Sequence, residues 1–202
     1  MSNITGNSKM NFEKEKNNYS YEYWFNNPQL NEWDSGDDNY YVNYFYEDIV
    51  KQLDLPQTGY IVVLGTHMCV SFDKLCKHFG YDRCIGYDLY NPVNHPSVRI
   101  KDCSTLSVID NIPIAFCHND LGNFPTTPQL KLHGQNWALK NIIPGGYFLG
   151  NNSKNSANID LETLMIESGF KNEFLVDLNR ENFDLSNIPE ARLPAYMLSK
   201  RF

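Results

Sequence analysis

The chain has 202 residues and a formal net charge of −7, and 42% of its residues are hydrophobic. This length suits one α/β domain with a short extension, and no apolar run is long enough to predict a membrane span. Residues 1–60 hold 10 Asp and Glu residues against 4 Lys and Arg residues, and also 13 of the 28 aromatic residues. Because a phosphate backbone is bound by Lys and Arg, this composition disfavours nucleic acid as a partner.

The N-terminal part divides into two expected segments. Residues 1–18 are polar, rich in Asn and Lys and without periodicity, so we expect a disordered tail. Residues 19–57 form an aromatic segment that ends in a helix, because apolar residues recur at every fourth position from Tyr41 to Leu53. The segment has two possible roles, packing on a sheet edge and capping a substrate pocket, and our hypothesis is that it does both.

The five cysteines are odd in number and follow no disulfide or zinc-binding spacing. The first residues carry neither the basic start nor the apolar centre of a signal peptide. We therefore expect reduced thiols and a cytoplasmic location.

From residue 58 to residue 202, apolar runs of strand length alternate with helical patterns. The expected strands are 60–64, 84–87, 98–100, 112–117, 147–149, 174–178 and 195–198, and the expected helices are 70–79, 137–143 and 160–168. Fully apolar short strands separated by helices predict a parallel sheet covered by helices on both faces.

The junction after the helix at 137–143 is Pro144-Gly145-Gly146, followed by the strand at 147–149. Pro ends a helix, and Gly supplies the left-handed turn that a reversal into a strand requires. This junction and the element order resemble class I S-adenosylmethionine-dependent methyltransferases over residues 58–202. The resemblance implies a doubly wound α/β fold with a mostly parallel seven-stranded sheet and an antiparallel C-terminal strand. It also implies S-adenosylmethionine as the cofactor.

In an open α/β sheet the ligand lies beyond the carboxyl ends of the strands. Gly65, Thr66 and His67 follow the first strand, where a glycine lets the backbone approach a nucleoside closely. Asp88 ends the second strand, 23 residues after Gly65, and its carboxylate can accept both ribose hydroxyls. NAD is disfavoured, because the turn lacks the further glycines of a pyrophosphate site. The alternative is that the residues from Gly65 to His67 form only a tight strand-to-helix turn and that Asp88 is only a turn residue.

Asp102 and Cys103 follow the third strand. They resemble the methyltransferase segment that meets the adenine, although Asp102 could instead cap the next helix. Asn119, after the fourth strand, is a further candidate for cofactor binding.

His118 and Asp120 also follow the fourth strand, and either could take a proton from a methyl acceptor. The alternative makes His118 a hydrogen-bonded turn residue. By resemblance to O-methyltransferases of small molecules, Asp120, Asn151 and Asn152 occupy the places of Mg²⁺ ligands, although one carboxylate and two amides would bind this ion weakly.

The expected function is methyl transfer to a small-molecule acceptor, such as a sugar or another hydroxyl compound. The first turn departs from the glycine-rich motif of the family at Val63, His67 and Cys69, and Cys69 stands where the second glycine is usual. A non-catalytic protein that has the fold, lacks the cofactor and works through protein interactions therefore remains the alternative.

Overall fold

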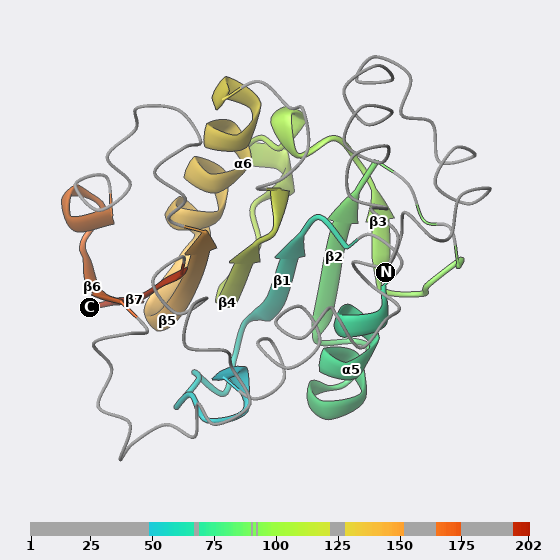
Figure 1. The fold of residues 1–202 in the computed structure, drawn as a ribbon, viewed down its shortest axis with the longest axis horizontal. Helices are drawn as coiled ribbons and strands as arrows, with labels where there is room; N and C mark the ends of the chain where they lie inside the picture. Colours follow the sequence, from blue (N-terminus) through green and yellow to red (C-terminus); the bar gives the residue numbers. More distant parts are fainter. Residues whose placement is uncertain are drawn as a thin grey trace, which may run out of the picture.

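The computed structural model describes residues 49–66, 69–89, 91, 93–121, 128–151, 165–174 and 196–202. These residues form one sheet of seven strands in the order β3-β2-β1-β4-β5-β7-β6 (Figure 1). The strands are β1 (Tyr60–Leu64), β2 (Cys84–Asp88), β3 (Val98–Ile100), β4 (Ile114–Asn119), β5 (Ile142–Asn151), β6 (Phe170–Phe174) and β7 (Tyr196–Arg201). β1 to β5 pair in parallel, and β7 is antiparallel to both of its neighbours. The predicted sheet is confirmed.

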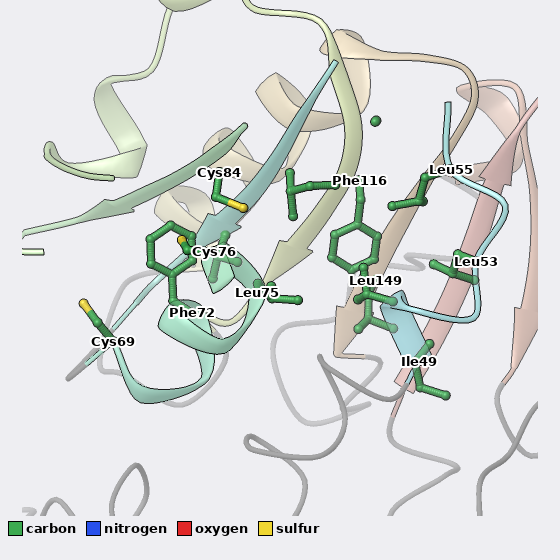
Figure 2. Close-up of a cluster of buried hydrophobic side chains, with 14 of the residues drawn as sticks. Ile49, Leu53, Leu55, Cys69, Phe72, Leu75, Cys76, Cys84, Phe116 and Leu149 are labelled. Atoms are coloured by element: carbon green, nitrogen blue, oxygen red, sulfur yellow. The ribbon is translucent and has the colours of Figure 1, made fainter. Parts of the chain in front are cut away.

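The helices α5 (Val70–Phe79) and α6 (Pro128–Asn141) cover opposite faces of this sheet. Successive side chains of a strand point to opposite faces, and β1 shows this directly. Ile61 and Val63 belong to the hydrophobic core beside α5, whereas Val62 and Leu64 belong to the core beside α6. Figure 2 shows the core beside α5, where side chains of that helix lie near strand residues of β4 and β5. The fold is therefore doubly wound, as expected.

The last residues of the predicted aromatic segment belong to the core beside α5. Ile49, Val50, Leu53 and Leu55 are all buried there. The expected tail at 1–18 and the segment up to residue 48 lie outside the described residues. Their predicted roles stay predictions.

β5 begins earlier than the sequence indicates. The expected helix at 137–143 ends at Asn141, and Pro144-Gly145-Gly146 lies inside the strand rather than between helix and strand. Ile142 pairs with Ile114 and Tyr147 pairs with Phe116, so the register advances five residues on β5 and two on β4. Gly145 has a φ of 80°, which suits an irregularity of this kind. A bulge tolerates Pro because the ladder is interrupted there.

The C-terminal strands also differ from the expected ranges. β6 spans Phe170–Phe174 and follows directly on the turn at Gly169, which has a φ of 82°. The expected strand at 174–178 is therefore placed too late, and β7 runs three residues further than the expected strand at 195–198. Of the helix expected at 160–168, the structure describes only the last turn, from residue 165.

Within the described residues, no helix is long and apolar enough to cross a membrane. All five cysteines are buried, and each is a free thiol.

Candidate functional site

The order of the strands reverses between β1 and β4, and the predicted site residues Gly65 and Asp120 directly follow these two strands. β1 pairs with β2 on one side and with β4 on the other. Beyond the end of β1, the Gly65 N–H donates to the Tyr87 carbonyl at 2.9 Å, and the Asp120 N–H donates to the Leu64 carbonyl at 2.8 Å. In open α/β sheets this is where ligands bind. The carboxyl ends of β1, β2 and β4 are thus joined at one edge.

The turn after β1 requires its glycine. Gly65 has a φ of 87°, and a Cβ there would lie 3.3 Å from the backbone carbon and oxygen of Asp120. Cys69, which stands in the place of the family's second glycine, has a φ of 65° and is buried. Cys69 therefore adopts the left-handed backbone conformation that glycine usually adopts, at some cost in strain. His67 lies outside the described residues.

Asp88 is held against this turn. The Thr66 N–H donates to Asp88 Oδ2 at 2.7 Å, and the Thr66 hydroxyl lies 3.5 Å from the same oxygen. The Lys101 N–H donates to the backbone carbonyl of Asp88 at 2.7 Å. The short bond from the Thr66 N–H to the carboxylate fixes the Asp88 side chain, and the bond from the Lys101 N–H fixes the end of the strand. Asp88 ends β2 as predicted, and its side chain is half-buried.

Asp102 and Cys103 lie beside Asp88. Asp102 caps the short helix η3 (Cys103–Thr105), because its Oδ1 accepts from the Ser104 N–H at 2.8 Å. The capping alternative is thereby confirmed, and it leaves the exposed carboxylate able to accept further bonds. Burial, reinforced by the charges of Asp88 and Asp102, raises the pKa of the Cys103 thiol to about 12. The thiol is therefore neutral at ordinary pH, and the three side chains are close enough to interact electrostatically.

His118 lies in β4, which continues through Asn119, two residues beyond the expected end of this strand at 117. The His118 side chain is buried, and its Nδ1 lies 3.1 Å from the Leu149 carbonyl. A carbonyl only accepts, so Nδ1 carries the proton of this bond. Nε2 lies 3.8 Å from Asp120 Oδ1. The alternative of a hydrogen-bonded turn residue is right about the hydrogen bond and wrong about the turn, because His118 is a strand residue bonded to the neighbouring strand.

Asn119 points to the other face of the sheet from His118, since the two are adjacent in a strand. Its Nδ2 donates to Gln135 Oε1 on α6 at 3.4 Å, and its Oδ1 accepts from the Leu121 N–H at 3.3 Å. Gln135 is buried, and no motif in the sequence points to it. A single polar residue inside a helix offers no spacing from which its contact could be predicted.

The three candidate Mg²⁺ ligands, Asp120, Asn151 and Asn152, are not all among the described residues. Asn151 is the last residue of β5, and Asn152 lies outside the described residues. In the part of the chain that the structure describes, no group of three or more His, Cys, Asp or Glu residues could hold a metal ion. Nothing here supports the predicted Mg²⁺ site.

Known structures share this arrangement of strands and helices. No protein-family model and no curated protein matches the sequence. CalS10, an amino pentose methyltransferase from Micromonospora echinaspora solved with S-adenosylmethionine, is 10% identical, with 92% of this chain and 99% of that chain covered and a TM-score of 0.59. The sugar N-methyltransferase KedS8 from Streptoalloteichus is 9% identical, with 86% and 92% covered and a TM-score of 0.56. An rRNA methylase from Streptococcus thermophilus is 13% identical, with 80% and 96% covered and a TM-score of 0.52.

The chain therefore has the fold of class I S-adenosylmethionine-dependent methyltransferases, as the sequence resemblance predicts. At these identities the likeness concerns the fold, and function has to be argued from the site.

Proposed function

We propose that the chain binds S-adenosylmethionine and transfers its methyl group to a small acceptor that carries a hydroxyl group, such as a sugar. The observation that carries this proposal is the Asp88 carboxylate, which the Thr66 N–H holds at 2.7 Å beside Gly65 at the reversal of strand order. A fixed carboxylate suits the two hydroxyl donors of a ribose, and a glycine in the left-handed region keeps the adjoining backbone free of a side chain.

The chemistry of the surrounding residues fits such a cofactor. Asp88 would accept from the ribose, and Asp102 with the backbone of Cys103 would meet the adenine. The remaining proposed cofactor contacts are Gly65, Thr66, His67 and Asn119. Cys103 is neutral and buried, so it adds no charge to the proposed cofactor site. The bound cofactor supplies a methyl group on a sulfonium, which makes the transfer an in-line displacement.

His118 and Asp120 are the proposed acceptor-side residues. The alignment of an acceptor contributes most to such a transfer, and a base is needed when the acceptor must lose a proton. Asp120 is the more accessible of the two, with 24% of its side chain exposed against 3% for His118. We assign Asp120 to the acceptor hydroxyl, and His118 Nε2, 3.8 Å from Asp120 Oδ1, takes up or returns the proton.

The acceptor class follows from charge, because the fold does not decide it. Structural neighbours act on an amino pentose and on rRNA. The net charge of −7 repels a phosphate backbone, so we favour a small molecule.

Turnover with labelled S-adenosylmethionine tests this proposal. The panel contains free sugars, nucleotide-linked sugars and RNA, and the readout is S-adenosylhomocysteine release together with the labelled product. We expect labelled sugar, and we expect Asp120→Asn to lower the rate about 100-fold without changing cofactor Kd. The exposed Asp82→Asn serves as the matched control and should leave the rate unchanged. Labelled RNA alone would contradict the acceptor class, and a folded chain that neither binds the cofactor nor turns over any acceptor would favour the non-catalytic alternative.

A further inference from the structure

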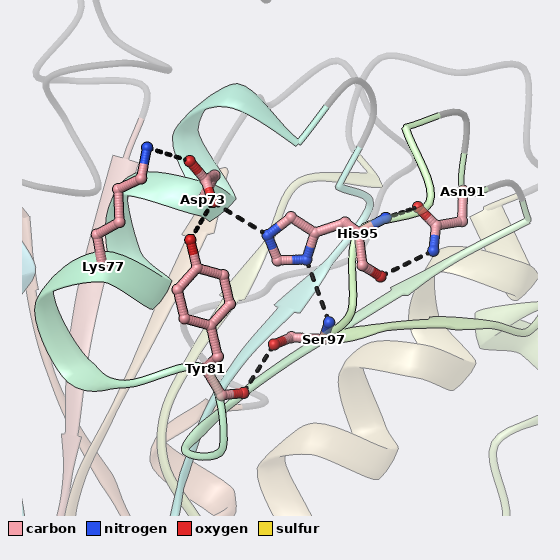
Figure 3. Close-up of polar contacts among 6 residues, drawn as sticks. All are labelled: Asp73, Lys77, Tyr81, Asn91, His95 and Ser97. Carbon is pink, nitrogen blue, oxygen red and sulfur yellow. Dashed lines mark hydrogen bonds and ion pairs between the residues drawn. The ribbon is translucent and has the colours of Figure 1, made fainter.

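A buried imidazole joins three parts of the chain on the α5 side of the sheet (Figure 3). The His95 side chain is only 6% exposed, and its Nε2 lies 3.3 Å from Asp73 Oδ1 on α5. Its Nδ1 accepts from the Ser97 N–H at 3.2 Å, just before β3. Asn91 closes the connection, since its Nδ2 donates to the His95 carbonyl at 2.9 Å and its Oδ1 accepts from the His95 N–H at 2.7 Å.

The bond directions exclude a nucleophilic role for this cluster. Asp73, His95 and Ser97 are the residue types of a catalytic triad, but in a triad the serine hydroxyl bonds to the imidazole. Here the Ser97 hydroxyl donates to the Tyr81 carbonyl at 2.7 Å, and the imidazole receives the backbone N–H of Ser97 instead. Because Nδ1 accepts, the neutral ring carries its proton on Nε2, which then donates to Asp73.

Packing connects this imidazole to the candidate cofactor site. The Phe72 ring lies 5.1 Å from the His95 ring, measured between centroids. A Cβ on Gly86 would lie 3.0 Å from Phe72 Cε1 and 2.4 Å from Thr66 Cγ2, so Phe72 and Thr66 both press on Gly86. Thr66 is the residue that bonds to Asp88. An unbroken series of contacts therefore runs from His95 to Asp88.

The connection between β2 and β3 depends on these bonds. It spans only residues 89–97, fewer than the dozen or so residues that a helical crossover between parallel strands usually takes. In place of a helix, hydrogen bonds made by Asn91, His95 and Ser97 hold the described residues of this connection. The side-chain bond between His95 and Asp73 ties this connection to α5.

We propose that His95 is a positioning residue for cofactor binding. Its bond to Asp73 holds the connection after β2 against α5, and this holds Asp88 in the orientation that binds ribose. The proposal rests on the proposed function, because it takes Asp88 as the ribose carboxylate.

Two substitutions at His95 separate its two bonds. His95→Gln places an amide donor near the position of Nε2, so the bond to Asp73 can be kept. His95→Asn places an amide acceptor near the position of Nδ1, so the bond from the Ser97 N–H can be kept while the bond to Asp73 is lost. Asp73→Asn changes the same contact from the side of α5. Lys77→Met is the matched control on α5, because Lys77 also pairs with Asp73, at 2.6 Å, but its side chain is 67% exposed.

The experiment is calorimetric titration of the full chain and each variant with S-adenosylhomocysteine, with melting temperatures measured in parallel. We expect His95→Asn and Asp73→Asn to raise Kd about tenfold, as small displacements of a binding group do. His95→Gln should stay within about threefold of the unaltered chain, and Lys77→Met should leave Kd unchanged.

The outcomes separate the positioning proposal from the proposed function. If His95→Asn lowers the melting temperature but leaves Kd unchanged, while Asp88→Ala abolishes binding, the role of His95 is merely structural and the positioning proposal is overturned. If the unaltered chain does not bind, both proposals fail. Should His95→Asn not fold, the comparison of Asp73→Asn with Lys77→Met decides in the same way.

Discussion

Replacing Gly86 by Ala should destabilise the domain at the contact between β2 and the turn after β1. A Cβ at Gly86 would lie 2.4 Å from Thr66 Cγ2 and 3.0 Å from Phe72 Cε1, so Thr66 would have to move. Thr66 is buried, and both its N–H and its hydroxyl contact Asp88 Oδ2. Overpacking of a buried site costs about 1–3 kcal/mol, and we expect Gly86→Ala to lie in this range.

Thr66→Ser provides the matched test, because it removes Cγ2 and keeps the hydroxyl and the backbone N–H. The closest contact in the double variant is then the one with Phe72, at 3.0 Å. We expect Gly86→Ala combined with Thr66→Ser to regain about half of the lost stability or more. The interaction free energy between the two sites should be about 1 kcal/mol in favour of the double variant.

Urea denaturation of the unaltered chain, the two single variants and the double variant measures this interaction. For a chain of this size, each 1 kcal/mol should also shift the melting temperature by about 2–4 °C. A double variant as unstable as the sum of the two single variants would refute the reasoning, since Thr66 Cγ2 would then not be the obstacle.

Two further predictions concern the buried indole of Trp137 and the half-buried carboxylate of Asp73. Within the described residues, the buried indole Nε1–H of Trp137 has no hydrogen-bond partner. Trp137→Phe should therefore cost less than about 1.5 kcal/mol in urea denaturation, and Trp137→Ala about 3–5 kcal/mol. A loss for Trp137→Phe as large as that expected for Trp137→Ala would contradict the unpartnered indole N–H. Lys77 foremost, with Tyr81 and His95, holds the pKa of Asp73 below its ordinary value of 3.8. The stability that this lowered pKa contributes is therefore fully present above pH 3.8 and is lost as the pH falls through the lower folded value. Asp73→Asn should make stability depend less on pH in that acid range, and an unchanged pH dependence would contradict the assignment.

The sequence predicts the elements that depend on local pattern. The continuous apolar run of β1, the helix α5 with Gly80 as its end, and the short β3 all have the bounds that the pattern indicates. Asp88 also ends its strand as predicted. These positions follow from apolar periodicity and from one glycine stop, so neighbouring residues suffice to predict them.

The sequence predictions are wrong where contacts between residues far apart in the sequence determine the structure. Pro144-Gly145-Gly146 has the chemistry of a turn, yet pairing with β4 draws it into β5 as a bulge. His118 looks like the start of a loop because it is polar, but the Leu149 carbonyl of the next strand satisfies its imidazole inside the sheet. The bonds of His95 to Asp73 and of Asn119 to Gln135 cross between elements, and no spacing in the sequence indicates them.

The central claim is that Asp88 and the turn at Gly65 bind S-adenosylmethionine. Calorimetric titration of the purified chain and of Asp88→Ala with S-adenosylhomocysteine tests it most directly. We predict micromolar binding by the unaltered chain and its loss in the variant, with both proteins folded. No binding by the folded, unaltered chain would contradict the claim and would favour a protein that has the methyltransferase fold without its cofactor.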